Sequence, residues 1–362
     1  MMKGRFISKF RIVGKLHGCK HPFTQTGSAS LFSRLFLSMI TVFWLLIGGA
    51  VLSEEWNVGL RMVDFADPII QDEIHVTVWY PTKANAKDEL VGMAILQVAK
   101  NADLAPATKG LILISHGFSG NFLGHEDTAR YLATNGYIVA TITHPDIPGL
   151  HSGIPELDPL ISRPRQITLI IDGISNHPLF KASLLSKKVG FVGFSLGAYS
   201  GLIAAGAKPD LSSLEEYCGT EPKDFLLCSV AARQRFISIE PQLLSLSVTK
   251  ISGAVLLAPA YGPLFSKTSF ANISIPMRLI SAGKDQELDN RFNAQHLKNL
   301  LSERATHSVI ADAGHFIFMA PCSDHLKQTV PVICEDLTSV DRVKTHRWLN
   351  KDIALFFDRL SP

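Results

Sequence analysis

A serine lies between two glycines near the middle of the chain, in the segment GFSLG at 193–197. The apolar run 188–194 precedes it, and residues 196–206 have the composition of a helix. A sharp turn from strand to helix strains the residue at the turn and brings the chain so close that only glycine fits on both sides. In this setting Ser195 is predicted to be a nucleophile, whereas in an ordinary turn it would only cap a helix.

A serine hydroxyl is a weak nucleophile at neutral pH and needs a base within hydrogen-bond distance, which a carboxylate in turn orients. Two later apolar runs are followed by residues of these types: Asp285 follows 276–283, and His315 follows 307–313. We expect His315 to take the proton of Ser195 and return it to the leaving group. Asp285 would fix the tautomer of the imidazole and stabilise its charged form.

Three further carboxylates lie close to this acid along the chain, namely Glu287, Asp289 and Asp312. Asp312 belongs to the last apolar run and is too close to His315 in sequence to face its ring easily. Glu287 and Asp289 remain alternatives to Asp285.

A glycine-rich turn follows the apolar run 110–115, directly after His116. The backbone N–H of Phe118 and that of Leu196 would bind the negative oxygen that develops in the transition state, where one such donor contributes about 3–4 kcal/mol. The alternative is a simple turn. His116 itself is expected to pack beneath this loop rather than to react.

Two polar residues, His144 and Asp146, follow the next apolar run, 136–143. They would either line the pocket of the site or fix the conformation of their own loop. Both interpretations stay open.

The elements that position these residues are short apolar runs with little alternation, as expected of strands covered on both faces. Stretches of helical composition lie between them, which predicts an α/β fold with a mostly parallel central sheet and helices on both faces. Ligands of such sheets bind at the carboxyl ends of the strands. The runs are 110–115, 136–143, 188–194, 253–259, 276–283 and 307–313, and the helical stretches are 123–135, 163–177, 196–206, 289–302 and 340–359.

Three segments of the body fall outside this alternation. Two β-rich runs, VGLRMVDF and EIHVTVWYP, are close enough to pair as the antiparallel start of the sheet. Residues 84–108 are expected to form a surface excursion. Residues 207–250 are too long for a plain connection and are expected to form a helical insertion over one end of the sheet.

The first 53 residues differ in composition from the rest of the chain. They contain seven Lys or Arg and no Asp or Glu, so the net charge of +3 conceals a mildly acidic body at 54–362. A body of this charge has no electrostatic reason to bind nucleic acid, which usually demands a clustered basic surface, and we expect no nucleic-acid partner.

An uncharged apolar run of eighteen residues, 35–52, ends this basic segment. Its length lies between that of a signal-peptide core and that of a membrane span, which needs roughly 20 residues. Positive charge before the run predicts that the body crosses the membrane, as a periplasmic or secreted protein if the run is cleaved or anchored in the inner membrane if it is kept. The long basic segment leaves open a start downstream of Met1.

Four cysteines lie in the body as two local pairs, Cys218 with Cys228 and Cys322 with Cys334. In an oxidising compartment each pair could close a short loop and stabilise it by roughly 3 kcal/mol. Four reduced and buried thiols are the alternative. A metal site is not expected, because neither pair has the short spacing that zinc sites favour.

Six segments together resemble the α/β-hydrolases related to dienelactone hydrolase and platelet-activating-factor acetylhydrolase. The resemblance covers about residues 57–358 and implies an α/β-hydrolase fold, ester hydrolysis without a metal or organic cofactor, and main-chain oxyanion donors at Phe118 and Leu196. The segments are VGLRMVDF…VTVWYPT, ISHGFSGN, YLATNGYIVATITHPD, RPRQITLIID, GFSLGAYS and AGHFIFMAPC.

Two departures from these families limit what the resemblance implies. Dienelactone hydrolases use a cysteine nucleophile where this chain has Ser195. The acetylhydrolases place their acid after the preceding strand, where this chain reads LLAPAYGPLF and has no carboxylate. The substrates of neither family are therefore expected to carry over.

The sequence thus predicts a serine hydrolase that cleaves a small-molecule or lipid-like carboxylic ester through an acyl-enzyme. Peptidase, lipase, phospholipid acetylhydrolase and acyltransferase activities use the same three residue types and remain alternatives. A non-catalytic binding protein tethered to the membrane through 35–52 is the alternative of a different class.

Overall fold

The computed structural model describes residues 56–145, 157–221, 224–246, 248 and 250–360. The basic leader, the apolar run 35–52 and Asp146 lie outside these ranges, so the expectations for them stay predictions. No helix within the described ranges is both long enough and apolar enough to cross a membrane.

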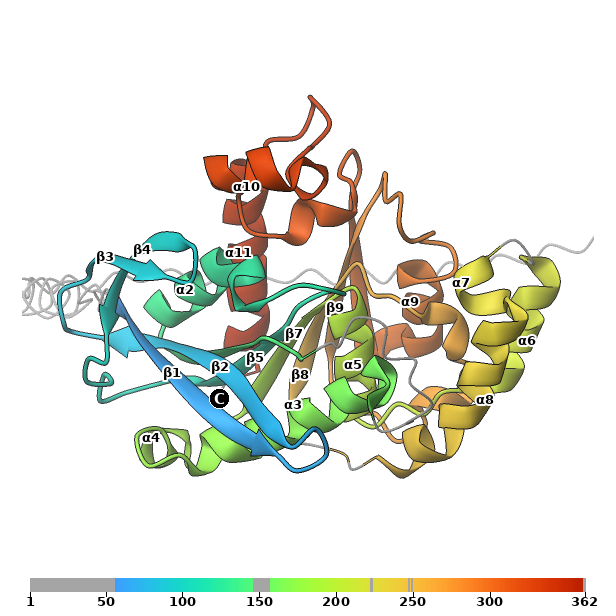
Figure 1. The fold of residues 1–362 in the computed structure, drawn as a ribbon, viewed down its shortest axis with the longest axis horizontal. Helices are drawn as coiled ribbons and strands as arrows, with labels where there is room; N and C mark the ends of the chain where they lie inside the picture. The colour runs from blue at the N-terminus through green and yellow to red at the C-terminus, as the bar shows by residue number, and fades with distance from the viewer. Residues whose placement is uncertain (1–55, 146–156, 222–223, 247, 249, 361–362) are drawn as a thin grey trace, which may run out of the picture. The chain divides into compact units, whose positions relative to one another are not determined.

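A mixed sheet of ten strands forms the centre of the described part (Figure 1). Its order is β10-β9-β8-β7-β5-β6-β2-β1-β4-β3. The strands from β5 to β10 are parallel to their neighbours among themselves, whereas β2 is antiparallel to both β1 and β6. The predicted mostly parallel sheet is thereby confirmed. The strands are β1 (Asn57–Asp67), β2 (Asp72–Thr82), β3 (Lys87–Val91), β4 (Ala94–Lys100), β5 (Gly110–Ser115), β6 (Tyr137–Ile142), β7 (Val189–Phe194), β8 (Gly253–Leu257), β9 (Met277–Ala282) and β10 (Ala305–Ile310).

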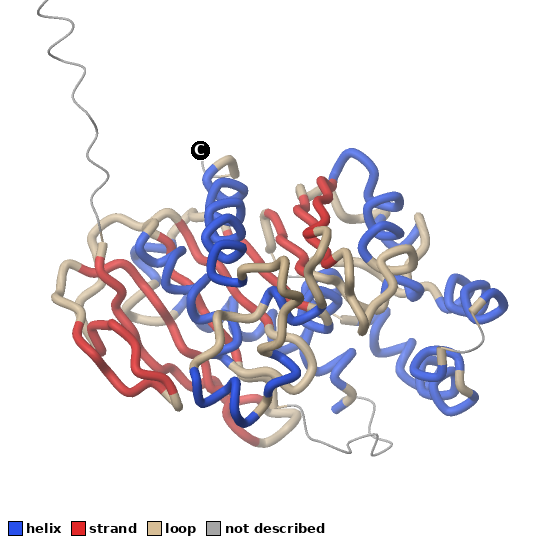
Figure 2. Tube along the Cα trace, turned by 90° about the horizontal axis from the view of Figure 1, so that it is seen from above, coloured by secondary structure: helices blue, strands red, loops and turns tan. Residues whose placement is uncertain are grey.

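Helices cover both faces of this sheet, as Figure 2 shows. On β5, Leu111 and Leu113 pack into an apolar cluster with residues of α3, α5 and α9, whereas Ile112 and Ile114 pack into a second cluster with α2 and α11. Alternate side chains of a strand point to opposite faces, so an uninterrupted apolar run is what a sheet between two helical layers requires. The helices are α2 (Glu126–Thr134), α3 (Pro159–Asn176), α4 (Lys181–Leu184), α5 (Leu196–Ala204), α6 (Leu211–Thr220), α7 (Phe225–Cys228), α8 (Val230–Ser245), α9 (Ala294–Leu301), α10 (Asp324–Thr329) and α11 (Arg342–Asp358).

The expected insertion at 207–250 contains the helices α6, α7 and α8. Their apolar faces include Leu214, Phe236 and Leu243, which are buried in the same cluster as α3 and α5. The insertion therefore extends the core on that face of the sheet.

The expectation of a surface excursion at 84–108 is wrong. Strands β3 and β4 pair there as an antiparallel hairpin, and β4 adds to the sheet beside β1. The two residues between these strands begin with Gly92, whose φ of 58° suits the tight turns that join hairpins. Along β4, Leu96 and Val98 are buried while Ile95 is exposed. Buried and exposed positions thus alternate, as is typical of a half-buried strand.

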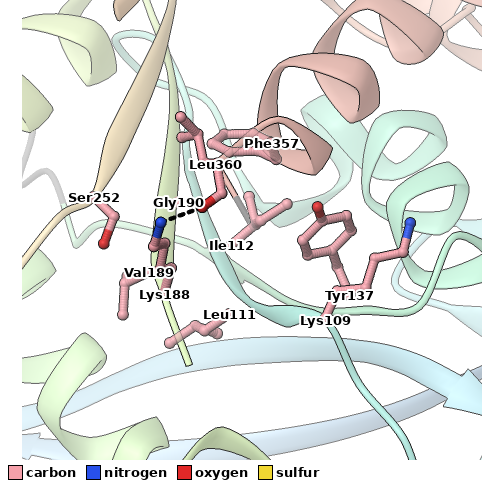
Figure 3. A pocket seen from close by; sticks show the side chains of 10 residues that line it. All are labelled: Lys109, Leu111, Ile112, Tyr137, Lys188, Val189, Gly190, Ser252, Phe357 and Leu360. Atoms are coloured by element: carbon pink, nitrogen blue, oxygen red, sulfur yellow. Dashed lines mark hydrogen bonds between the residues drawn. The ribbon is translucent and has the colours of Figure 1, made fainter. Parts of the chain in front are cut away.

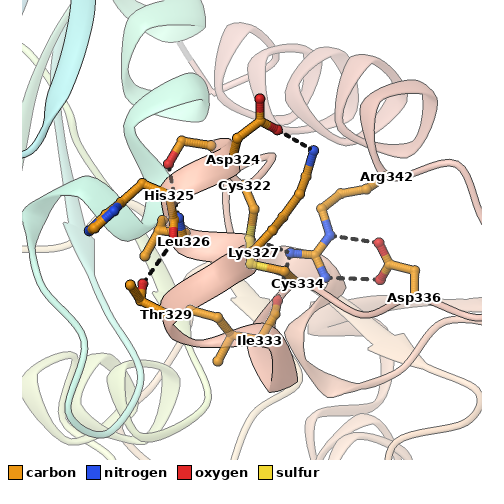
Figure 4. Close-up of a disulfide and its surroundings, with 11 residues drawn as sticks. Cys322, Asp324, His325, Leu326, Lys327, Thr329, Ile333, Cys334, Asp336 and Arg342 are labelled. Atoms are coloured by element: carbon orange, nitrogen blue, oxygen red, sulfur yellow. Dashed lines mark hydrogen bonds and ion pairs between the residues drawn. A yellow bond between two sulfur atoms is a disulfide. The ribbon is translucent and has the colours of Figure 1, made fainter.

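Both cysteine pairs form disulfides. Cys218 at the end of α6 joins Cys228 of α7 with a Cα–Cα distance of 5.3 Å, and Cys322 joins Cys334 at 5.8 Å. The second bridge closes a loop that contains α10 (Figure 4). Disulfides persist in oxidising compartments, which agrees with an exported body.

The loop 322–334 has little other support, because neither α10 nor the short 3-10 helix at 331–333 contains a buried residue. Arg342 donates to the carbonyl oxygen of Ile333 at 2.8 Å and pairs with Asp336, and this contact holds one end of the loop (Figure 4). We predict that Cys322→Ser with Cys334→Ser makes this loop the first site of cleavage in limited proteolysis and removes up to about 3 kcal/mol of stability.

The matched control is Cys218→Ser with Cys228→Ser, because that bridge joins helices that also contribute Leu214 and Leu227 to the core. We expect its loop to be cut more slowly under the same conditions. Equal resistance of the loop 322–334 with and without its bridge would contradict the prediction.

Candidate active site

Ser195 lies in the turn from β7 to α5 with φ 53° and ψ −117°. A positive φ in a residue that is not glycine costs on the order of 1–3 kcal/mol and occurs where the surrounding structure enforces it. The glycines on either side allow this turn. A Cβ on Gly193 would lie 2.6 Å from the backbone of Ala198, and one on Gly197 would lie 2.2 Å from the carbonyl oxygen of Ser115. The geometry is that of a serine projected from a strained strand-to-helix turn.

His315 and Asp285 meet at the carboxyl end of the sheet. Nδ1 of His315 lies 2.8 Å from Oδ2 of Asp285, and the two side chains are 5% and 1% exposed. The other oxygen, Oδ1, accepts hydrogen bonds from the backbone N–H groups of Glu287 and Leu288. With Oδ2 on the imidazole, the proton of His315 is held on Nδ1 and the lone pair of Nε2 is left to act as a base.

The alternative carboxylates do not face this histidine. Asp289 pairs with Arg291, and both Glu287 and Asp312 are exposed. Asp285 is thus the carboxylate that the structure brings to His315.

Phe194 connects the histidine to the serine. Its ring lies against that of His315, with 4.8 Å between the centroids, and it directly precedes Ser195 in the chain. The same ring also contacts Phe318 and His125, so these rings pack around the residue that precedes Ser195. Within the described residues the Ser195 hydroxyl makes no hydrogen bond, so the structure brings His315 next to this turn without a formed Ser–His hydrogen bond. In enzymes without substrate such contacts are often long and tighten on binding.

The two predicted oxyanion donors come from segments that touch. A Cβ on Gly117 would lie 3.4 Å from Cβ of Ser195, so the loop that carries Phe118 passes directly beside the serine. Leu196 is the first residue of α5, where backbone N–H groups have no partner within the helix. Neither the N–H of Phe118 nor that of Leu196 donates a hydrogen bond to another described residue. Two amide donors therefore remain available beside Ser195.

His116 and His144 form a buried polar layer under this loop. Nδ1–H of His116 donates to the Gly117 carbonyl oxygen at 2.6 Å, and its Nε2 accepts the backbone N–H of His144. His144 in turn lies between Ser115 and Gln166. Burial, and next the charge of Arg163, lower the pKa of His116 to about 3. Both rings are occupied and neutral, so His116 packs beneath the loop as expected and His144 is held by Ser115 and Gln166.

The segment that carries His315 is anchored by histidines at the start of α2 and on α11, which pack in the same apolar cluster as Ile317 and Phe318. Nδ1–H of His125 donates to the carbonyl oxygen of Phe318 at 3.0 Å, and Nε2 of His346 lies 2.8 Å from that of Ile317. Nδ1 of His346 contacts Asp127. No sequence pattern points to these residues, because α2 and α11 meet this segment only in the folded chain.

Burial lowers the pKa of His125 to about 4, well below the usual 6.5 of histidine. Because the folded state keeps this ring neutral, its stabilising contribution is complete above pH 6.5 and is lost as the pH falls toward 4. We predict that the free energy of unfolding falls by about 3 kcal/mol less between pH 6.5 and pH 4 in the variant His125→Gln than in the unmodified protein. The glutamine keeps a donor near the Phe318 carbonyl oxygen. Urea unfolding at several pH values measures it.

His75→Gln is the matched control, since this exposed ring has its pKa raised by the hydrogen bond to Asp64. A raised pKa favours the folded state at low pH, so we expect that variant to be at least as acid-sensitive as the unmodified protein. If the His125 variant were as acid-sensitive as the unmodified protein, the burial of His125 as a neutral ring would not explain the loss.

A pocket at the amino ends of the central strands is not part of the candidate active site. It is lined by Lys109, Leu111, Val189 and Phe357, among others, at the amino ends of β5 and β7 (Figure 3). Ser195 follows the carboxyl end of β7, so the pocket and the serine lie at opposite ends of the same strands. Within the described ranges, no group of three or more His, Cys, Asp or Glu side chains is arranged to hold a metal ion.

Comparison with known proteins gives a structural relationship only. No model of a protein family and no curated protein sequence matches the chain. Among solved structures, a ferulic acid esterase from Streptomyces cinnamoneus matches with a TM-score of 0.55 and 16% identity, over 86% of this chain and 92% of that chain. This match, the mostly parallel sheet with helices on both faces and the strained turn at Ser195 show that the chain has the α/β-hydrolase fold.

Proposed function

We propose that the protein is a serine hydrolase that cleaves carboxylic esters through an acyl-enzyme. The observation that carries the proposal is the buried hydrogen bond between His315 and Asp285 beside the strained turn of Ser195. A histidine held by a carboxylate on Nδ1, next to a serine in this conformation, is the arrangement that activates a hydroxyl for attack on a carbonyl.

In the first half of the reaction, Nε2 of His315 takes the proton of Ser195 as the serine oxygen attacks the ester carbonyl. The negative oxygen of the tetrahedral intermediate accepts hydrogen bonds from the N–H groups of Phe118 and Leu196. The intermediate then collapses, His315 gives the proton to the alkoxide, and an alcohol leaves.

In the second half, water attacks the acyl group on Ser195 while His315 takes one of its protons. Collapse of this second intermediate returns the proton to the serine oxygen and releases the carboxylic acid. Asp285 stabilises the imidazolium in both halves, and no step needs a metal or an organic cofactor.

The substrate class that we propose is a small-molecule or lipid-like ester. Phe118 follows Gly117 in the loop that passes beside the serine, and because it is 70% exposed we propose that it offers an apolar contact for an acyl or aryl group. Within the superfamily we place the chain near the dienelactone hydrolase and platelet-activating-factor acetylhydrolase relatives, on the segments that resemble theirs. The structural neighbour is named as an esterase for ferulic acid, so esters of aromatic acids belong among the compounds to be tested.

We further propose that the catalytic body acts outside the cytoplasm. The two disulfides support an oxidising compartment, and the basic segment before 35–52 supports export. If the run 35–52 is kept, it would hold the protein at the membrane. A mass measurement of the exported protein separates the cleaved from the anchored form.

The test of the proposed function combines labelling with hydrolysis. The purified full chain is treated with a fluorophosphonate, and initial rates are measured on p-nitrophenyl esters of increasing acyl length and on a feruloyl ester. We expect a covalent adduct on Ser195 and release of acid and alcohol in equal amounts. A folded protein that hydrolyses none of these esters and never labels at Ser195 would favour a binding protein on the same scaffold.

A further inference from the structure

Arg163 is the fifth residue of α3 and is fully buried, at 0% exposure. Its Nη1 donates to the carbonyl oxygen of His116 at 2.7 Å, and its Nη2 donates to that of Gly117 at 3.1 Å. A buried cation is unfavourable unless hydrogen bonds compensate for the lost water. This guanidinium is therefore directed at the two peptide groups that lead into Phe118.

The two carbonyl groups belong to the peptide planes on either side of Gly117. The space at Gly117 is narrow, because a Cβ would lie 3.0 Å from the ring of Phe194 and 3.4 Å from Cβ of Ser195. Glycine also leaves the rotation between the two planes unusually free. One rigid guanidinium that holds both carbonyl oxygens removes this freedom, because its N–H groups have a fixed separation and a common plane.

The hydrogen bond from Arg163 to the Gly117 carbonyl oxygen acts directly on a proposed oxyanion donor. The carbonyl of Gly117 and the N–H of Phe118 belong to one planar trans peptide group and point in opposite directions. Arg163 shares this carbonyl oxygen with Nδ1–H of His116. Fixing the oxygen on these two donors therefore aims the N–H of Phe118 away from both. The same hydrogen bond polarises the peptide group and strengthens its N–H as a donor.

We propose that Arg163 is a positioning residue of the oxyanion hole, which holds the peptide planes around Gly117 so that the N–H of Phe118 is oriented before the substrate arrives. The inference rests on the proposed function, since it concerns the same site. Arg163 would stabilise the transition state rather than the ground state, because the oxyanion exists only after attack. Its loss is expected to lower kcat while leaving KM nearly unchanged.

The chain supplies a matched control two residues away. Arg165 lies on the same turn of α3, but its guanidinium pairs with Asp67 at the end of β1 and does not contact the loop of Phe118. Arg165→Met therefore removes a partly buried ion pair that holds α3, without affecting the peptide planes around Gly117. It reports what a purely structural loss in this helix does to activity.

The experiment compares the full-length chain with three variants, Arg163→Met, Arg163→Lys and Arg165→Met. On a p-nitrophenyl ester we expect kcat to fall about 30- to 100-fold for Arg163→Met and about 10-fold for Arg163→Lys, with KM within about threefold. A lysine keeps the charge but cannot bridge both carbonyl oxygens. Binding of a trifluoromethyl ketone, which forms a tetrahedral adduct on serine, should weaken in parallel with kcat/KM. Arg165→Met should keep kcat within about twofold even where its Tm falls.

The inference is overturned if Arg163→Met keeps the kcat and the ketone affinity of the unmodified protein, or if Arg165→Met loses as much kcat. If Arg163→Met does not fold, the kcat and ketone affinity of Arg163→Lys decide by the same criteria. Failure of the inference leaves Ser195 reactive toward fluorophosphonate. Failure of the proposed function is recognised separately, because the unmodified protein then neither labels at Ser195 nor hydrolyses an ester, and the inference fails with it.

Discussion

Replacement of Ser195 by alanine is expected to lower kcat/KM for ester hydrolysis by roughly 10⁴-fold or more, without loss of the fold. The hydroxyl makes no hydrogen bond within the described part of the chain, so its removal leaves no buried partner unsatisfied. The turn keeps its glycines and its backbone contacts, including the hydrogen bond from the Ser195 N–H to Leu257. Activity falls because no acyl-enzyme can form. Initial rates with a p-nitrophenyl ester and thermal unfolding of the same samples measure both effects.

Ser200→Ala is the matched control. This serine lies on α5, the helix that follows Ser195, and its hydroxyl donates to the carbonyl oxygen of Leu196 at 2.8 Å. We expect that variant to keep most of its activity and its labelling by fluorophosphonate. Substantial hydrolysis by the Ser195 variant, at a rate that tracks protein concentration, would show that another group performs the attack.

The positions of Ser195 and His315 could be predicted because apolar runs reveal buried parallel strands. The carboxyl ends of such strands gather at one edge of the sheet, so the polar residue after each run belongs to one region. Ser195 follows β7, Asp285 follows β9 and His315 follows β10 by a few residues. The helices on both faces follow from the same runs, because a strand without alternation must be covered twice.

The choice among the nearby carboxylates depended on contacts that a sequence does not display. Asp285 faces His315 because the backbone N–H groups at 287 and 288 hold its other oxygen, whereas Asp289 is occupied by Arg291. The hairpin β3–β4 was missed for a different reason. Polar and apolar residues alternate there in a short segment, and its charged side chains resemble those of a loop.

Arg163 shows the limit of sequence reasoning more clearly. The segment RPRQ contains two arginines two positions apart, and nothing in the sequence separates their roles. In the structure one is buried against the peptide groups of His116 and Gly117, and the other pairs with Asp67. Which side of α3 meets the loop is decided by packing between elements that are distant along the chain.

Replacement of Asp285 by asparagine is expected to lower kcat by roughly 10⁴-fold while KM and the fold are kept. The backbone N–H groups of Glu287 and Leu288 donate to Oδ1, so the asparagine must turn its carbonyl oxygen toward them. Its NH₂ group then occupies the place of Oδ2 and donates to Nδ1 of His315. A neutral imidazole with a donor at Nδ1 carries its proton on Nε2, where it can no longer accept the proton of Ser195.

The expected loss depends on the orientation of the side chain at 285 rather than on charge alone, and two neighbouring variants test this. Asp289→Asn and Glu287→Gln each remove one negative charge close to Asp285 along the chain, but neither side chain contacts His315. We expect both to keep kcat within about threefold, because exposed charges are screened by water. If Asp285→Asn kept more than a tenth of the activity, or if Asp289→Asn lost as much, the carboxylate that orients His315 would have to be sought elsewhere. Steady-state kinetics with one p-nitrophenyl ester across the three variants distinguishes these results.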